Sequence, residues 1–264
     1  MLRNVFTKWL WDARRSIITW TLAILLVGGG YAAFWLTIKT PEIQKALESY
    51  PQGLLEALNY DDISTAAGYL TASVYGLIVA VLLVVYSISA GTQTIAGDEE
   101  AGTLDLIAAH PVSRTRLALH RFVSFFASVV IITAVFWVGM LALIGPAQLE
   151  DISIADFAAI HVHLVLFATV FGALSYAVGA ATGRRSLAIG AGSAVGVLGY
   201  LANGIVPQVE GLKWVENLSP FHWLTGGDPL RNGIHAGDSL LMVGLAVVLV
   251  TLGTRAFSGR DISV

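Results

Sequence analysis

Residues 98–116 read DEEAGTLDLIAAHPVSRTR and stand between two nearly uncharged stretches, 69–88 and 119–143. Each flanking stretch has about the 20 apolar residues that a helix needs to cross the roughly 30 Å of hydrocarbon in a bilayer. A polar segment between two such stretches belongs outside the lipid, because charged side chains at membrane depth are costly. The pattern therefore predicts two membrane helices joined by a segment that lies in water.

Four further apolar stretches of similar length occur along the chain. Together these stretches predict six membrane spans, at 17–36, 69–88, 119–143, 157–181, 187–206 and 239–256. The composition agrees, because 56% of the 264 residues are hydrophobic and 12% are charged, at a mean hydropathy of +0.73. A soluble domain has about a quarter charged residues. We expect an all-α integral membrane protein in which residues 1–264 form one six-span domain.

The charged residues avoid the predicted spans. Arg121 lies at a span edge, and no Asp, Glu or Lys stands inside a span, which argues against a proton-coupled carrier. With the N-terminus in the cytoplasm, eleven Lys and Arg residues fall on the inner side, and four fall on the outer side: Lys39, Lys45, Lys213 and Arg231. The positive-inside rule therefore predicts a multi-pass protein of the cell membrane with both termini in the cytoplasm.

Three segments outside the spans have a character of their own. Apolar side chains at helical spacing in residues 1–16 predict an amphipathic helix in the inner interface, with an ordinary extension of the first span as the alternative. The acidic outer loop 37–68 is expected to form short amphipathic helices that cap the bundle, or else to gather substrate. The aromatic-rich stretch 207–238 is expected on the outer side, partly re-entering the bundle.

Local chemistry within 94–116 predicts a short helix presented to the cytoplasm. The acidic residues 98–100 stand at its start, where the positive end of the helix dipole favours them. Pro111 ends this helix because it lacks an N–H donor. Ser113 or Thr115 is expected to cap the helix that leads into the third span. A solvated loop with a fortuitous helix is the alternative.

The same residues resemble the cytoplasmic signature of ABC-2 type transporter permeases. In that family, a pattern E-x-G-T-L-[DE]-L-x-x-x-x-P-[VI]-S-R joins spans two and three. It is matched here by Glu100, Gly102, Thr103, Leu104, Asp105, Leu106, Pro111, Val112, Ser113 and Arg114. The amphipathic start, the six spans and the strings 219–221 (SPF) and 227–230 (GDPL) are also similar, so the resemblance covers the whole chain. It points to a bacterial branch of small permeases regarded as antibiotic or multidrug exporters.

This resemblance implies a type V exporter-like transmembrane domain that works with a second copy of itself or with a homologous permease. It further implies separate ABC ATPase subunits docked on the cytoplasmic side, with 94–116 as the coupling helix segment. The residues expected to carry the coupling are Glu99, Glu100, Gly102, Thr103, Leu104, Asp105, Leu106, Pro111, Ser113 and Arg114.

The chain lacks the usual sequence devices of an enzyme. A P-loop needs G-x-x-x-x-G-K-[ST], and none of the four Lys residues follows a Gly. There is no G-x-S-x-G motif and no pair of carboxylates within the spans. We therefore expect no catalytic residue and no cofactor in this chain, with ATP and Mg²⁺ held by the partner ATPase. His161 and His163 lack a carboxylate at ligand spacing, so no metal site is expected, and neither is a nucleic-acid partner.

Polar side chains on otherwise apolar spans point to a cavity for an amphiphilic substrate. The candidates in or beside spans two and five are Tyr75, Tyr86, Ser89, Tyr200 and Asn203. Hydrogen bonding between helices explains the same residues without a substrate. Gly192 and Gly196 in span five allow close helix approach, either within one subunit or between subunits.

We therefore expect the permease subunit of an ATP-driven transporter that exports a hydrophobic or amphiphilic small molecule, such as an antibiotic, a drug or a lipid-like compound. Two alternatives stay open at this point. One is an ABC-2 permease for cation extrusion or metalloenzyme maturation. The other is a transmembrane signalling or scaffold subunit that moves no substrate.

Overall fold

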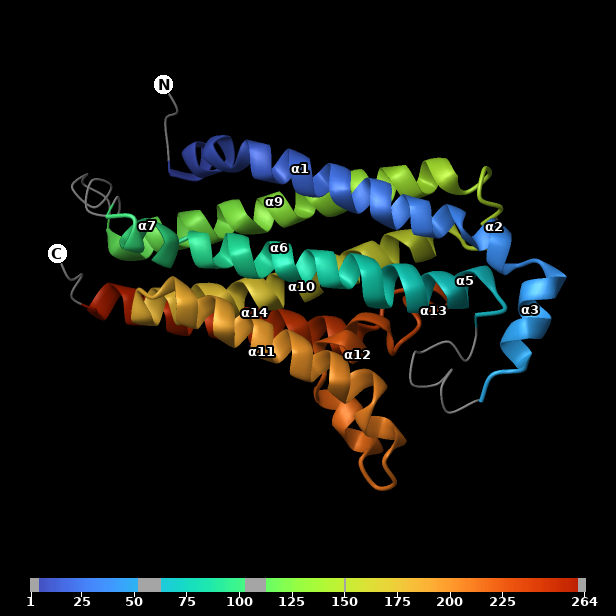
Figure 1. Ribbon diagram of the computed structural model, residues 1–264. Helices are drawn as coiled ribbons and strands as arrows, with labels where there is room; N and C mark the ends of the chain where they lie inside the picture. Colours follow the sequence, from blue (N-terminus) through green and yellow to red (C-terminus); the bar gives the residue numbers. More distant parts are fainter. Residues whose placement is uncertain (1–4, 52–62, 103–112, 150, 261–264) are drawn as a thin grey trace.

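A computed structural model describes residues 5–51, 63–102, 113–149 and 151–260, and within these ranges every regular element is helical (Figure 1). Six helices are long and apolar enough to cross a membrane. They are α1 (Val5–Ala33), the helix that ends in α6 (Val79–Gln93), α9 (Arg114–Leu143), α10 (Ile154–Thr182), α11 (Arg185–Gly204) and α14 (Ala236–Gly259). The expected all-α, six-span architecture is confirmed.

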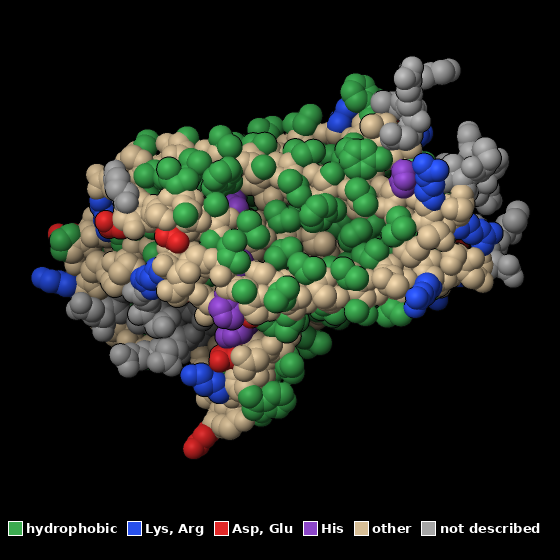
Figure 2. Space-filling model, turned by 180° about the vertical axis from the view of Figure 1, so that it is seen from behind, with side chains coloured by type: hydrophobic (Ala, Val, Ile, Leu, Met, Phe, Trp, Pro, Cys, Tyr) green, Lys and Arg blue, Asp and Glu red, His purple; other side chains and the backbone are tan. Residues whose placement is uncertain are grey.

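The helices form an elongated bundle whose surface is apolar in the middle and charged toward the two ends. Both chain ends lie at the same end of the bundle, which we call the terminal end (Figure 1). Hydrophobic side chains cover the middle of the face drawn in Figure 2, and the charged side chains lie toward the two ends. An apolar band with charged ends is the surface that a helical protein presents to a bilayer.

The helix α10 lies at the centre of the bundle. In its most apolar 18-residue stretch, 72% of the residues are buried, against 17% in α11 and 28% in α1 and α14. It packs against α6, α9, α11 and α14. Its rings Phe157, Phe167 and Phe171 are fully buried, with Phe125 and Phe136 of α9. The central helix is therefore enclosed by protein, and the outer helices present their apolar faces to the surroundings.

Glycines let α6 and α10 approach each other closely. A Cβ on Gly91 of α6 would lie 2.9 Å from the Cα of Gly172 on α10, closer than real Cβ atoms come. The two backbones therefore touch where neither residue has a side chain. Gly192 and Gly196 of α11 are buried and face α6 and α10 of the same chain, near Ile88 and other side chains. These two glycines thus serve packing within the subunit.

Polar caps extend the helices past the predicted spans. Ser113 and Ser153 are the N-caps of α9 and α10, each with a side chain that accepts from the backbone N–H three residues later, and His235 caps α14 in the same way. Gly183 closes α10 in the left-handed conformation, with φ 69°. Caps satisfy the free backbone groups at helix ends. These helices therefore begin at polar residues that lie outside the apolar stretches from which the spans were predicted.

The first helix has no break where the sequence predicts a boundary between 1–16 and 17–36. α1 has 29 residues and measures about 44 Å at 1.5 Å per residue, more than the hydrocarbon layer of about 30 Å. Part of α1 therefore lies outside that layer. That residues 1–16 form this interfacial part stays a prediction. At the opposite end, α2 (Trp35–Ile38) and α3 (Pro41–Glu48) follow, so one of the expected short helices in 37–68 is present.

The second span contains a feature that the sequence did not predict. α5 (Ala66–Tyr69) and α6 are joined by η1 (Leu70–Ile78), a π-helix of nine residues. A π-helix adds residues to each turn and shifts the side chains that follow around the helix axis. The register of α6 therefore cannot be extended from Tyr69 by a simple 3.6-residue repeat.

The stretch 207–238 folds into four short helices. They are η2 (Val206–Gln208), η3 (Lys213–Leu218), α12 (Pro220–Thr225) and α13 (Pro229–Asn232). α12 packs back against the bundle, where the Phe221 ring contacts the Phe167 and Tyr200 rings at 5.1 and 5.5 Å between centroids. η2 and η3 project from the far end of α11 (Figure 1), and Trp214 is 59% exposed. The stretch therefore has one part inside the bundle and one part outside it.

Candidate functional site

α7 (Ala96–Glu100) is the main described element of the segment 94–116, and it lies at the terminal end (Figure 1). Ile95, directly before it, is fully buried in a small apolar cluster that is separate from the main core. The other members come from α9, α10 and α14, and they are Leu117, Ala118, Tyr176, Ala180 and Phe257. The burial of Ile95 therefore holds the start of α7 against α9, α10 and α14. The acidic residues 98–100 follow in the second half of α7.

Glu99 joins α7 to the end of α14. Its carboxylate forms an ion pair with the guanidinium of Arg260, and the exposed fractions of the two side chains are 11% and 22%. The Nη1 of Arg114, at the start of α9, donates to the backbone carbonyl of Arg260 at 2.5 Å. Arg260 therefore contacts α7 with its side chain and α9 with its main chain.

Glu100 joins α7 to the start of α11. Its Oε1 accepts a hydrogen bond of 2.8 Å from the backbone N–H of Arg185, the first residue of that helix. A carboxylate is favourable there because the N-terminus of a helix carries partial positive charge and free N–H groups. Arg184, the residue at the N-cap, makes no side-chain cap. Glu100 thus performs the capping role from another part of the chain.

Asp98 joins α7 to α9 on a third side. Its carboxylate pairs with Arg121, whose side chain is 5% exposed. The Nη1 of Arg121 also donates to the carbonyl of Thr94 at 2.7 Å. Three consecutive acidic residues therefore each contact a different helix, which are α9, α14 and α11 in the order of the sequence.

The structure places half of the residues predicted for coupling. Glu99 and Glu100 lie in α7, and Gly102 follows it with φ 65°. Ser113 is the N-cap of α9, one of the two caps that the sequence allowed, and Arg114 is the first residue of that helix. The other predicted residues lie in 103–112, outside the described residues, and they are Thr103, Leu104, Asp105, Leu106 and Pro111.

Sequence reasoning missed the partners of the acidic residues. Arg121 carried a local signal, as an isolated charge at the edge of an apolar stretch. Arg260 and the Arg185 backbone gave none, because they are 161 and 85 residues from their partners in the chain. Only the packing of α10, α11 and α14 brings them to α7.

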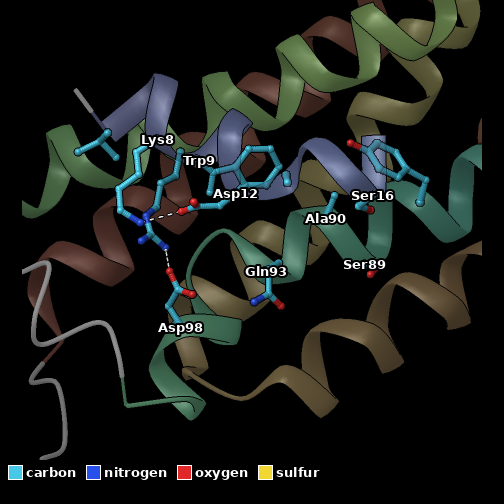
Figure 3. A pocket seen from close by; sticks show the side chains of 12 residues that line it. Lys8, Trp9, Asp12, Ser16, Ser89, Ala90, Gln93 and Asp98 are labelled. Atoms are coloured by element: carbon cyan, nitrogen blue, oxygen red, sulfur yellow. Dashed lines mark hydrogen bonds and ion pairs between the residues drawn. The ribbon is translucent and has the colours of Figure 1, made fainter. Parts of the chain in front are cut away.

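A cavity of about 440 Å³ opens beside α7, between α1, α6 and α9. In Figure 3, Lys8, Trp9, Asp12 and Ser16 come from α1, Ser89, Ala90 and Gln93 come from α6, and Asp98 comes from α7. The remaining lining residues are Val5, Ala13, Tyr86 and Arg121. Lys8 and Asp12 form an exposed ion pair at 2.7 Å. The cavity therefore has apolar and aromatic walls together with two basic and two acidic side chains, whose charges offset each other.

The five residues predicted for a substrate cavity lie in three places. Tyr86 and Ser89 line this cavity, and the Tyr86 hydroxyl donates to Ser128 at 2.5 Å. Tyr75 is fully buried in η1, with ring contacts to neighbouring side chains. Tyr200 packs on α12, and Asn203 is half-buried near the end of α11. Tertiary packing, including the π-helix, decided which polar residues of a span share a face. Contact of any of the five with substrate stays a prediction.

The two histidines of α10 are used for packing and for fixing the stretch 207–238. The Nδ1 of His161 lies 2.6 Å from the carbonyl of Phe157, one turn earlier. His163 contacts the carbonyl of Trp223 through Nδ1 at 3.1 Å, and its Nε2 accepts from the His235 N–H at 3.3 Å. Among the described residues, no group of three His, Asp or Glu side chains is arranged to hold a metal ion.

The fold and the site together define a polytopic helical membrane protein with a short acidic helix fastened to several spans at one end. A family model described as ABC-2 family transporter protein matches residues 3–262, and the chain belongs to this family. No protein of curated function matches the chain. The protein is thus a multi-pass membrane permease subunit of an ABC transporter, a class that associates with an ABC ATPase subunit.

Proposed function

We propose that this permease exports a hydrophobic or amphiphilic small molecule, driven by ABC ATPase subunits that bind ATP and Mg²⁺ and dock on the segment 94–116. The terminal end then faces the cytoplasm, and the working unit contains a second copy of the chain or a homologous permease. The fastening of α7 carries this proposal. Because Asp98, Glu99 and Glu100 contact α9, α14 and α11, a displacement of the segment by an ATPase would reach three spans at once.

The charge distribution supports the proposed orientation. The terminal end holds the ends of α9, α11 and α14 with Arg114, Arg116, Arg185 and Arg255. Lys and Arg residues near span ends are retained on the cytoplasmic side. Both termini and α7 would then lie in the cytoplasm, where an ATPase can reach them.

The cavity beside α1 supports an amphiphilic substrate. Its walls include the rings of Trp9 and Tyr86 and the polar groups of Ser89 and Gln93. Binding sites for small molecules combine an apolar lining with a few placed polar groups. The cavity also lies at the terminal end, so the proposed orientation puts it within reach of molecules from the cytoplasm or the inner leaflet.

Reconstitution tests the function. The permease and its copurified ATPase are placed in proteoliposomes, and ATP-dependent movement of fluorescent amphiphiles and lipids is measured with ATP hydrolysis. We expect transport that disappears when the ATPase is inactivated by mutation. Intact, permease-dependent ATP hydrolysis with no movement of any drug or lipid would contradict export and favour the signalling alternative, while movement of a metal cation would favour the cation alternative.

A cavity variant tests the site. Ser89→Trp places a large ring in the cavity, and we expect substrate transport to fall roughly tenfold or more because a substrate can no longer enter it. Val81→Trp is the matched control, because Val81 lies two turns earlier on the same helix and is 42% exposed. Equal transport by the two variants would remove this cavity from the transport path.

A further inference from the structure

Five groups meet at the terminal end and form what we call the clamp: Glu99, Glu100, Arg114, Gly183 and Arg260. We propose that Arg260 is a positioning residue that fastens α7 to the end of α14, so that α7, the Gly183 turn and the adjoining helix ends move as one rigid unit. This inference rests on the proposed function, because it states how the segment 94–116 passes its displacement to the spans.

The burial of the ion pair is the first support. The side chains of Glu99 and Arg260 are 11% and 22% exposed. Water therefore screens the attraction between them less than it screens an exposed pair. The exposed pair Lys8–Asp12, at 62% and 57%, shows the contrast within the same molecule. The Glu99–Arg260 contact is therefore a fixed part of the structure, whereas the Lys8–Asp12 contact lies open to solvent.

The Gly183 turn is the second support. At φ 69° the backbone of Gly183 has the left-handed conformation that favours glycine. A Cβ at this position would also lie within 2.5 Å of Glu99 Oε1 and would overlap the guanidinium of Arg260. The ion pair therefore lies directly over the turn between α10 and α11. A side chain at residue 183 would therefore require the ion pair to shift.

Contacts on two further sides make the unit rigid. The backbone of Arg260 accepts from Arg114, and Glu100 accepts from the Arg185 N–H on the other side of the Gly183 turn. Below these polar contacts, the apolar cluster around Ile95 joins α7 to α9, α10 and α14. A hinge inside this region would have to break an ion pair, two hydrogen bonds and an apolar contact together.

Cross-linking tests the rigidity directly. The chain has no cysteine, so the double variant A101C/S258C contains the only two thiols of the permease. Ala101, just after α7, and Ser258, in α14, are both exposed, so this variant keeps the Glu99–Arg260 ion pair. A bis-methanethiosulfonate linker with a flexible spacer is used, because a disulfide requires Cα atoms within about 7 Å. The complex with its ATPase is treated without nucleotide and again after trapping with ATP and vanadate, and linked peptides are quantified by mass spectrometry. We expect equal linkage in both states. Loss of linkage in either state would overturn the rigid unit.

Charge exchange tests the positioning role. Glu99→Arg and Arg260→Glu each place like charges together, and we expect transport per ATP hydrolysed to fall roughly tenfold, with the complex still assembled. The double exchange E99R/R260E restores opposite charges and should recover most of the ratio. Arg255→Glu is the control, because Arg255 is an exposed arginine of the same helix. Wild-type ratios in both single variants, or no recovery in the double exchange, would overturn the role of Arg260.

The two proposals fail in different ways. If the wild-type complex moves no substrate, the export function fails, while the linkage in two nucleotide states still decides whether the clamp is rigid. If the wild-type complex transports and the linkage is lost on trapping, export stands and the rigid clamp is wrong.

Discussion

Arg121 carries a charge into the bundle, and Asp98 supplies the opposite charge from α7. With 5% of its side chain exposed, Arg121 has lost most of its hydration, and the carboxylate and the Thr94 carbonyl replace the water. At this scale the segment 94–116 depends on individual acidic residues, because Asp98 and Glu99 each supply a counter-charge to an arginine and Glu100 accepts from a backbone N–H at a helix start.

Asp98→Asn should therefore lower the free energy of unfolding by about 3 kcal/mol, because it leaves a buried guanidinium without its counter-charge. Chemical unfolding of the purified permease in detergent measures the change. Asp12→Asn is the matched control, since Asp12 forms an ion pair that is more than half exposed and should change stability by less than about 1 kcal/mol. Equal effects would mean that Arg121 is hydrated in the folded protein.

At the scale of the elements, the contact between α6 and α10 decides how the bundle closes. Gly91 and Gly172 place two backbones in contact, and the Phe125 ring covers the same point from α9. In a membrane, where lipid tails are as apolar as the side chains, such close packing provides the attraction between helices. Some glycines of the other spans differ, because a Cβ on Gly30, Gly190 or Gly244 would meet no atom within 4 Å.

Gly91→Ala should separate α6 from α10 and lower the free energy of unfolding by about 1–3 kcal/mol, the cost of overpacking a tight interior. Gly190→Ala, on α11, places its methyl group where no atom lies within 4 Å. It should leave stability unchanged or raise it by up to about 1 kcal/mol, because alanine favours the helix. Thermal unfolding of both variants in the same detergent compares them. A neutral Gly91→Ala variant would mean that the two helices are not in contact in the membrane.

At the scale of the whole molecule, polar groups gather at two ends that an apolar band separates (Figure 2). The terminal end carries α7 and both chain ends, and the opposite end carries α3 and α13 (Figure 1). The Gly183 turn also lies at the terminal end, because it is beside Glu99 of α7. Opposite ends of a membrane-spanning bundle face different compartments. The proposed function therefore requires that α7 be reachable only from the cytoplasm.

Because the chain has no cysteine, single-cysteine variants can report its orientation. Ser186→Cys lies at the terminal end, and Asn217→Cys lies in η3 beyond the bundle, and both residues are exposed. A membrane-impermeant maleimide should label the Asn217 variant in intact cells and the Ser186 variant only after permeabilisation. The reverse pattern would place α7 outside the cell and would contradict docking of a cytoplasmic ATPase.

The sequence by itself determined the six spans, a cap at Ser113 or Thr115 and the family signature in 94–116. These features depend on neighbours along the chain. Twenty apolar residues satisfy their own backbone hydrogen bonds as a helix in lipid, and a serine caps the helix that begins at the next residue. Hydropathy set the helix ends too narrowly because it ignored such caps, and it gave no sign of the π-helix at Leu70–Ile78.

Only the tertiary structure decided which side chains meet. It brought Glu99 to Arg260 and Glu100 to the Arg185 N–H, it placed the Glu99–Arg260 pair over Gly183, and it separated Tyr86 from Tyr75 and Asn203. The apolar faces of the six spans are chemically alike, so the sequence of one span does not specify its neighbour. Shape, through the glycine contacts and the buried ion pairs, selects one arrangement, and that arrangement fastens α7 to the helices that it is proposed to move.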